Sequence, residues 1–205
     1  HDLRSARRAA AHPTGHGVRP SYRTPPAPGP RRLFFETAGG VAPLELLAGV
    51  ARGIFARALT APVAVDLEAD RYEIVAQPEA HLPGNRFNDG KVDRRGHFFA
   101  GSMDDRERLD SGTVYRFDPE LTWTVIDNDY RVTNGPAFSP SGEVMYENDS
   151  ARQITYAFDL HSDGNVTNRR TFLEFGRGEG YPDAMTVDSE GCLWIAFWDG
   201  WCVRR

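Results

Sequence analysis

Three stretches of the chain follow one plan, and their spacing constrains the fold more than any other feature. Each stretch has a polar segment, then a turn glycine, then a short apolar strand, and the three glycines are Gly96, Gly142 and Gly191. Gly142 lies 46 residues after Gly96, and Gly191 lies 49 residues after Gly142. Repeats of about 40–50 residues that contain several short strands are typical of β-propeller blades. The spacing therefore predicts an all-β fold of the propeller type.

A polar residue stands eight positions before each glycine: Asn88, Asn134 and Asp183. We expect each of them in a loop just before the first strand of its repeat. Equivalent positions in successive blades surround one axis, so the three side chains should converge at one end of it. Oxygen ligands that converge in this way suit a hard or borderline cation. Taken singly, such residues are more often turn formers, but their shared register favours a common site.

Strand-like patterns fill the rest of each repeat. His97–Gly101 is short, aromatic and ended by glycine, which predicts a strand buried on both faces. Alternating patterns predict hairpins of Val63–Leu67 with Tyr72–Ala76, Val114–Phe117 with Trp123–Ile126, and Ile154–Phe158 with Arg170–Phe175. Each repeat then has about four strands, and residues 49–205 hold roughly three and a half blades.

The first 48 residues differ in composition from the rest. They contain seven of the 14 prolines and seven arginines against three acidic residues. Arg19–Arg32 shows no apolar periodicity. We therefore divide the chain into a poorly ordered, Arg/Pro-rich segment at 1–48 and a partial propeller at 49–205.

The overall charge and composition exclude some classes of partner. A net charge of −5 and a pI of about 5.7 disfavour nucleic-acid binding, and no apolar run is long enough for a membrane span. Cys192 and Cys202 fit no metal or redox motif. Free thiols in a reducing cytoplasm are the expectation; the sequence does not predict an oligomeric state.

Three segments resemble the SMP-30/gluconolactonase/regucalcin family: RFNDGKVD from Arg86, NGPAFSPSGEVMY from Asn134 and YPDAMTVDSEGCLWIA from Tyr181. They occur in the family's order and spacing, and the resemblance covers about residues 53–205. It implies a six-bladed propeller, truncated here to about three to four blades. It also implies hydrolysis of a sugar lactone with a divalent metal cation, Ca²⁺, Zn²⁺ or Mn²⁺.

The resemblance also implies roles for individual residues. Asn134 and Asp183 match metal ligands, and Asp183 matches the residue that serves as general base. Arg86 and Asn88 match substrate-binding positions, and Asn88 can also lie near the metal. The alternative for Arg86 is a surface ion pair with Asp89 or Asp93. An acid that contacts substrate is expected within Asp104–Glu107, without a specific assignment.

One departure from the family pattern affects the expected activity. Members supply a glutamate ligand from a Gly-Glu-x-Pro segment, and no such segment is present in this sequence. Glu45 stands in the register of the other polar positions and is the first candidate to replace it. With one charged ligand, we expect this chain, a fragment or the product of a shifted reading frame, to be a poor lactonase. The alternatives are a metal- or protein-binding propeller without turnover, an inactive remnant, or a related esterase.

The aromatic run Trp194, Phe197, Trp198 and Trp201 has two interpretations. Packing in the core of a blade is favoured over a platform on which sugar rings stack.

Overall fold

The computed structural model describes residues 61–66, 71–74, 76–118, 120 and 122–205. The chain divides into two units, residues 1–30 and 31–205, and every described residue belongs to the second. The segment predicted to be poorly ordered, residues 1–48, and with it Glu45, lies outside the described residues.

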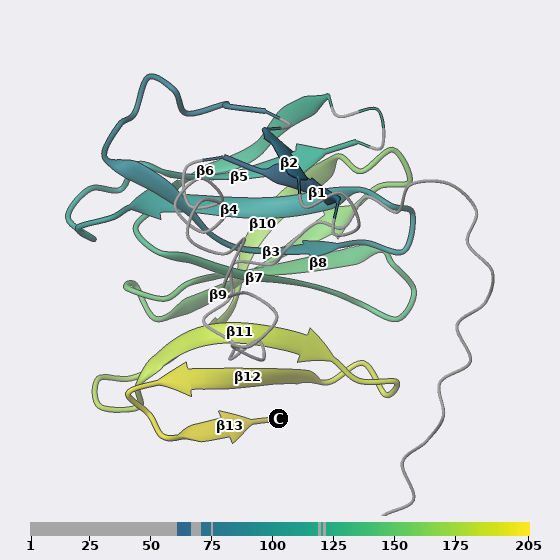
Figure 1. Ribbon diagram of the computed structural model, residues 1–205. Coiled ribbons are helices and arrows are strands. Elements are labelled where there is room, and N and C mark those ends of the chain that lie inside the picture. Colours follow the sequence, from purple (N-terminus) through teal and green to yellow (C-terminus); the bar gives the residue numbers. More distant parts are fainter. Residues whose placement is uncertain (1–60, 67–70, 75, 119, 121) are drawn as a thin grey trace, which may run out of the picture. The chain divides into compact units, whose positions relative to one another are not determined.

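The described residues form thirteen strands and no helix (Figure 1). A hairpin of β1 (Val63–Asp66) and β2 (Arg71–Ile74) comes first. The first blade contains β3 (Asn85–Val92), β4 (Phe98–Asp104), β5 (Gly112–Phe117) and β6 (Trp123–Tyr130). The second blade contains β7 (Thr133–Phe138), β8 (Val144–Asp149), β9 (Ile154–Leu160) and β10 (Val166–Glu174). The third blade contains β11 (Tyr181–Val187), β12 (Leu193–Trp198) and β13 (Cys202–Arg204).

Each blade is an antiparallel meander in which consecutive strands pair. The first strand of the second blade, β7, packs against β3 on one side and β11 on the other. The first strands of the three blades are therefore neighbours, as in the inner ring of strands around a propeller axis. The predicted four-stranded repeat is confirmed for the first two blades.

The three turn glycines occupy equivalent positions, as the spacing predicted. Gly96, Gly142 and Gly191 each close the hairpin between the first two strands of a blade, and each donates its N–H to the carbonyl three residues earlier. Their φ angles are 93°, 73° and 86°. Glycine reaches this left-handed region without the steric cost that a side chain adds.

The expectation that the three polar residues lie in loops is wrong. Asn88, Asn134 and Asp183 lie inside β3, β7 and β11. Each strand has a break in its register beside the polar residue: at Phe87/Asp89, at Asn134/Ala137 and at Pro182/Met185. A bulge interrupts the alternation of side chains and re-aims one of them, so a turn-like sequence can still form a strand here.

Apolar clusters fill the spaces between neighbouring blades and cover the face of the first blade that is turned away from the second. Between the first and second blades lie Phe99, Met145, Phe158 and Leu160. The opposite face of the first blade buries Phe87, Phe98, Ala100, Tyr115 and Phe117. Adjacent residues of β4 thus serve opposite faces, and all seven of its residues are buried. The prediction of a strand buried on both faces is confirmed.

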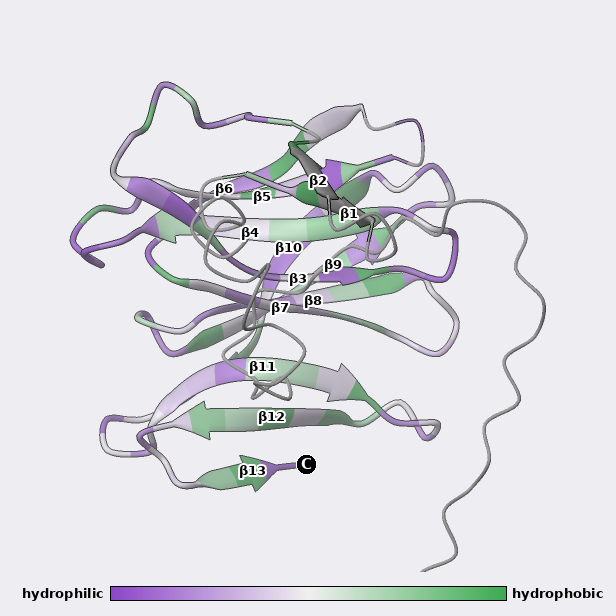
Figure 2. Cartoon of the chain, in the orientation of Figure 1, coloured by the Kyte–Doolittle hydropathy of each residue, from purple (hydrophilic) through white to green (hydrophobic). Residues whose placement is uncertain are grey.

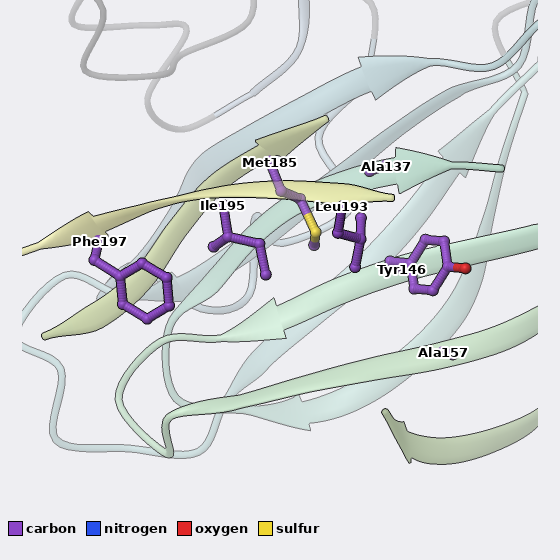
Figure 3. Close-up of a cluster of buried hydrophobic side chains, with 7 residues drawn as sticks. All are labelled: Ala137, Tyr146, Ala157, Met185, Leu193, Ile195 and Phe197. Carbon is purple, nitrogen blue, oxygen red and sulfur yellow. The ribbon is translucent and has the colours of Figure 1, made fainter. Parts of the chain in front are cut away.

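A third cluster joins the second and third blades (Figure 3). It consists of Ala137, Tyr146, Ala157, Met185, Leu193, Ile195 and Phe197. Alternation along β12, a mostly hydrophobic strand in Figure 2, points Ile195 and Phe197 into this cluster. The same alternation leaves Trp194 and Trp198 on the other face, 41% and 71% exposed. Core packing was therefore predicted correctly for Phe197 and wrongly for the tryptophans, since Trp201 is also exposed.

Cys192 and Cys202 are both free thiols, in agreement with the sequence-based expectation. The part of the chain that the structure describes contains no helix that is long and apolar enough to span a bilayer.

The packing of β4 against β7 gives a test of the blade arrangement. A Cβ added at Gly101 of β4 would lie 2.4 Å from the Cβ and Oγ1 atoms of Thr133. Because Thr133 is fully buried, Gly101→Ala should lower the free energy of unfolding by about 1–3 kcal/mol in a denaturant titration. Gly84→Ala is the control, since its added Cβ would lie 3.6 Å from Asp104 Oδ1, an ordinary contact. Equal stability of the two variants would contradict the packing.

Candidate functional site

A side-chain hydrogen bond joins the first strands of the first and second blades. Asn88 Nδ2 donates to Asn134 Oδ1 at 3.0 Å and to the Thr133 carbonyl at 2.7 Å. The bulges in β3 and β7 lie beside these two residues. Two of the three residues in the predicted register are therefore in direct contact.

Arg86 orients Asn88 from the same strand. Its Nη1 donates to Asn88 Oδ1 at 2.6 Å, and its Nε pairs with Asp105 Oδ1 at 2.8 Å. The structure thus shows an ion pair of Arg86 with Asp105, an acid other than the two that the sequence suggested. Asp104 has a different task, because its carboxylate accepts the backbone N–H groups of Arg108 and Leu109. Within Asp104–Glu107, the acid beside Arg86 is therefore Asp105.

Ser150 connects Asn134 to the third blade. Asn134 Nδ2 donates to Ser150 Oγ at 2.8 Å, and Ser150 Oγ donates in turn to the Pro182 carbonyl. Pro182 immediately precedes Asp183. Asn134 and Ser150 are 8% and 6% exposed, so these hydrogen bonds are shielded from water.

Asp183 is held through its backbone by Asn148. Asn148 Nδ2 donates to the Asp183 carbonyl at 2.6 Å, and Asn148 Oδ1 accepts from Thr155 Oγ1 at 2.6 Å. The Asp183 side chain is half-buried, and its Oδ1 accepts the N–H of Ala184 at 2.8 Å. Burial raises the pKa of the Asp183 carboxyl above its usual value, and the hydrogen bond from Ala184 partly offsets this.

Sequence reasoning did not find Ser150 or Asn148, and it indicated the stretch that contains Asp105 without assigning the residue. The sequence position of Asn148 could have indicated its role. Asn148 stands six residues after the turn glycine Gly142, and Asn134 stands eight residues before it, so the two lie on the two strands of one hairpin. Pairing across that hairpin places Asn148 opposite Asn134. No sequence pattern identifies Ser150, because its role depends on a carbonyl from another blade.

Next to these residues on β3, two further hydrogen bonds join the first blade to the second and third blades. Asp89 Oδ2 accepts the N–H of Gly135 at 2.9 Å, and Lys91 Nζ donates to the Met185 carbonyl at 2.7 Å. Gly135 has a φ of 113°, and a Cβ there would lie 2.8 Å from Met185 Cε. The β7 bulge beside Asn134 therefore requires glycine.

A buried acid lies behind the same bulge. Glu147 on β8 is fully buried, and neither of its carboxyl oxygens has a hydrogen-bond partner in the described residues. Burial raises the pKa of Glu147 well above its usual value, and the charges of Asp89, Asp127 and Asp149 raise it further, while Lys91 opposes them. The folded protein therefore holds the Glu147 proton to a higher pH than the unfolded chain does.

The oxygen donors of the site fit a hard cation. Within the described residues there is no group of three or more His, Cys, Asp and Glu side chains that could hold a metal. A cation here would therefore need carboxamide as well as carboxylate oxygens. Asn134 Oδ1 accepts one hydrogen bond and has a second lone pair. Asp183 uses Oδ1 for its one side-chain hydrogen bond to a described residue, so Oδ2 is available to a ligand.

The sequence is similar to those of known proteins. Residues 22–205 match the family model described as SMP-30/Gluconolactonase/LRE-like region. The 6-deoxy-6-sulfogluconolactonase of Pseudomonas putida is 36% identical over 142 residues, which make up 69% of this chain and 49% of that protein. Regucalcin from Danio rerio is 38% identical over 126 residues, which make up 60% of this chain and 43% of that protein.

Solved structures share the fold. A luciferin-regenerating enzyme superposes with a TM-score of 0.66 at 26% identity, covering 71% of this chain and 51% of that one. A calcium-binding protein, regucalcin, from Agrobacterium tumefaciens superposes with a TM-score of 0.64 at 26% identity, covering 68% and 48%.

The stacked blades and their neighbouring first strands define a β-propeller of the regucalcin type. The chain belongs to the SMP-30/Gluconolactonase/LRE-like family, so the resemblance seen in the three motifs is confirmed. It spans about half the length of the relatives that it matches.

The buried acid predicts an unusual dependence of stability on pH. Because the folded-state pKa of Glu147 lies above the usual 4.5, its proton is held more tightly in the folded protein than in the unfolded chain. The free energy of unfolding is therefore highest below about pH 4.5, as far as Glu147 is concerned, and it falls as the pH rises through the folded-state pKa. Glu147→Gln, which carries no charge, should therefore gain stability over the unaltered protein as the pH rises, measured by thermal unfolding between pH 4.5 and 8.

The control is Glu143→Gln, because Glu143 is exposed on the same blade. A stability difference for Glu147→Gln that does not change with pH would show that the carboxyl is not held neutral.

Proposed function

We propose that this chain hydrolyses a sugar lactone with the help of a divalent cation. The observation that carries the proposal is the convergence of polar groups from three blades: Asn88 bonds to Asn134, and Asn134 is linked through Ser150 to the strand that bears Asp183. Membership of a family that includes a sulfogluconolactonase supports this substrate class.

Asp183 is the residue that we assign as general base. Hydrolysis of a lactone adds water to the carbonyl carbon and breaks the ring C–O bond, which yields a hydroxy acid. The attacking water must lose a proton, and a carboxylate within hydrogen-bond reach can accept it. The half-buried position of Asp183 leaves its carboxylate open to water.

Arg86 and Asn88 are the residues that we assign to the substrate. Arg86 directs Nε to Asp105 and Nη1 to Asn88. Among the described residues nothing pairs with its Nη2, so this group can donate to a sugar hydroxyl or to the lactone oxygen. The fixed guanidinium plane would orient the substrate, and Asn88 lies between it and Asn134.

Asn134 Oδ1 and the Asp183 carboxylate are the groups that would hold the cation, with Asn88 beside them. A bound Ca²⁺, Zn²⁺ or Mn²⁺ would polarise the lactone carbonyl and acidify a water molecule. The regucalcin from Agrobacterium tumefaciens, described as calcium-binding, supports Ca²⁺ as the first ion to test.

Asp183→Asn should abolish most turnover, because it removes the base and one charged ligand together. In an indicator assay on aldonolactones with Ca²⁺, Zn²⁺ or Mn²⁺, we expect kcat/KM to fall by about a hundredfold or more. The control is Asp163→Asn, since Asp163 also accepts a backbone N–H, but in an exposed turn between β9 and β10.

Unchanged turnover in Asp183→Asn would refute the assignment. Cation binding without hydrolysis of any lactone would instead favour the alternative of a binding propeller without catalysis.

A further inference from the structure

Four side-chain hydrogen bonds in a row share one donor direction across the three blades. Arg86 donates to Asn88, Asn88 to Asn134, Asn134 to Ser150, and Ser150 to the Pro182 carbonyl. The row begins at a guanidinium, which can only donate, and ends at a backbone carbonyl, which can only accept. Its two ends therefore fix the direction of every member between them.

We propose that Ser150 is a positioning residue that sets the orientation of the Asn134 carboxamide and thereby the affinity of the site for a cation. This inference rests on the proposed function for the cation, but its geometric part stands on the hydrogen bonds alone. A carboxamide presents an oxygen on one side and an NH₂ group on the other. Only the oxygen can bind a cation, so the orientation of residue 134 decides whether a ligand faces Asn88 and the site.

The Ser150 hydroxyl allows the Asn134 carboxamide only one orientation. Its single proton goes to the Pro182 carbonyl, so towards Asn134 it can only accept. The Asn134 NH₂ group must then face Ser150, at 2.8 Å, and Oδ1 must face Asn88. A reversed amide would set two acceptors against each other at Ser150 and two NH₂ groups against each other at Asn88.

The surroundings hold the Ser150 side chain in place. The backbone N–H of Ser150 donates to the Val132 carbonyl at 2.9 Å, and its own carbonyl accepts from Gln153 at 3.0 Å. Ser150 and Asn134 are both buried, so water does not readily replace either partner. Groups that orient a ligand in this way typically change metal affinity by about 10–100-fold when removed.

Calorimetric titration of the full 205-residue chain with Ca²⁺ tests the role. Ser150→Ala should weaken Ca²⁺ binding by about tenfold or more, whereas Ser150→Thr keeps a hydroxyl and should restore most of the affinity. Ser139→Ala is the matched control, since it removes a hydroxyl that accepts backbone N–H groups at the β7–β8 turn. Equal affinities in Ser150→Ala and the unaltered chain overturn the proposal.

The Asn134→Asp variant separates an effect of Ser150 on the orientation of residue 134 from an effect on the packing of the site. In Asn134→Asp both side-chain atoms are oxygens, so the orientation no longer matters. Adding Ser150→Ala to Asn134→Asp should therefore change Ca²⁺ affinity far less than Ser150→Ala does alone. If the loss is as large in this background, Ser150 acts on the site through packing and the proposal is wrong.

An NMR experiment on the side-chain amide of Asn134 measures its orientation without any metal. With ¹⁵N-labelled asparagine, the Nδ2 protons of Asn134 should show NOEs to the β protons of Ser150. NOEs to the Nδ2 protons of Asn88 in their place overturn the proposed orientation. If the unaltered chain binds no Ca²⁺, the proposed function fails, and the NOEs still establish or refute the orientation.

Discussion

The hydrogen bond between the Asn88 and Asn134 side chains is the contact on which the site depends. It joins the first strands of two blades at the points where bulges break their register. Ser150 extends the connection to the Pro182 carbonyl of the third blade. Three separate sheets are thus tied together by the side chains of Asn88 and Asn134 on the first strands of two blades and by Ser150 in the turn after β8, so polar groups that lie far apart in the sequence come together.

Burial of the apolar clusters offsets the desolvation cost of this polar region. Thr133, Asn148 and Thr155 are fully buried beside the site, and each makes a side-chain hydrogen bond, so their desolvation is largely compensated. Glu147 is the exception in the described residues of this region, since a buried carboxyl without a partner costs on the order of 1–3 kcal/mol. Apolar packing on both faces of the second blade offsets that cost.

Much of the fold could be predicted from the sequence because glycine spacing and strand alternation are local signals. Gly96, Gly142 and Gly191 mark the three inner hairpins, and the shared register brought Asn88 and Asn134 to the same place. The strands β3, β7 and β11 were mistaken for loops at their polar positions, because a bulge and a turn favour similar residues. Ser150 was missed, and Asp105 was not singled out within Asp104–Glu107, because each acts on a group that pairing between distant segments brings near. The exposed tryptophans of the third blade show a similar limit, since composition alone does not reveal which face of β12 is covered.

The most direct test of the central claim is where a paramagnetic cation binds. Addition of Mn²⁺ to the ¹⁵N-labelled chain should broaden the NMR signals of Asn88, Asn134, Ser150 and Asp183 first, because Asn134 and Asp183 are the proposed ligands and the side chains of Asn88 and Ser150 bond to Asn134. The amides of Gly96, Gly142 and Gly191, in the hairpin turns eight residues further along each repeat, should stay sharp. Broadening centred on those turns, or spread evenly over the exposed acids, would contradict a single cation site on the inner strands.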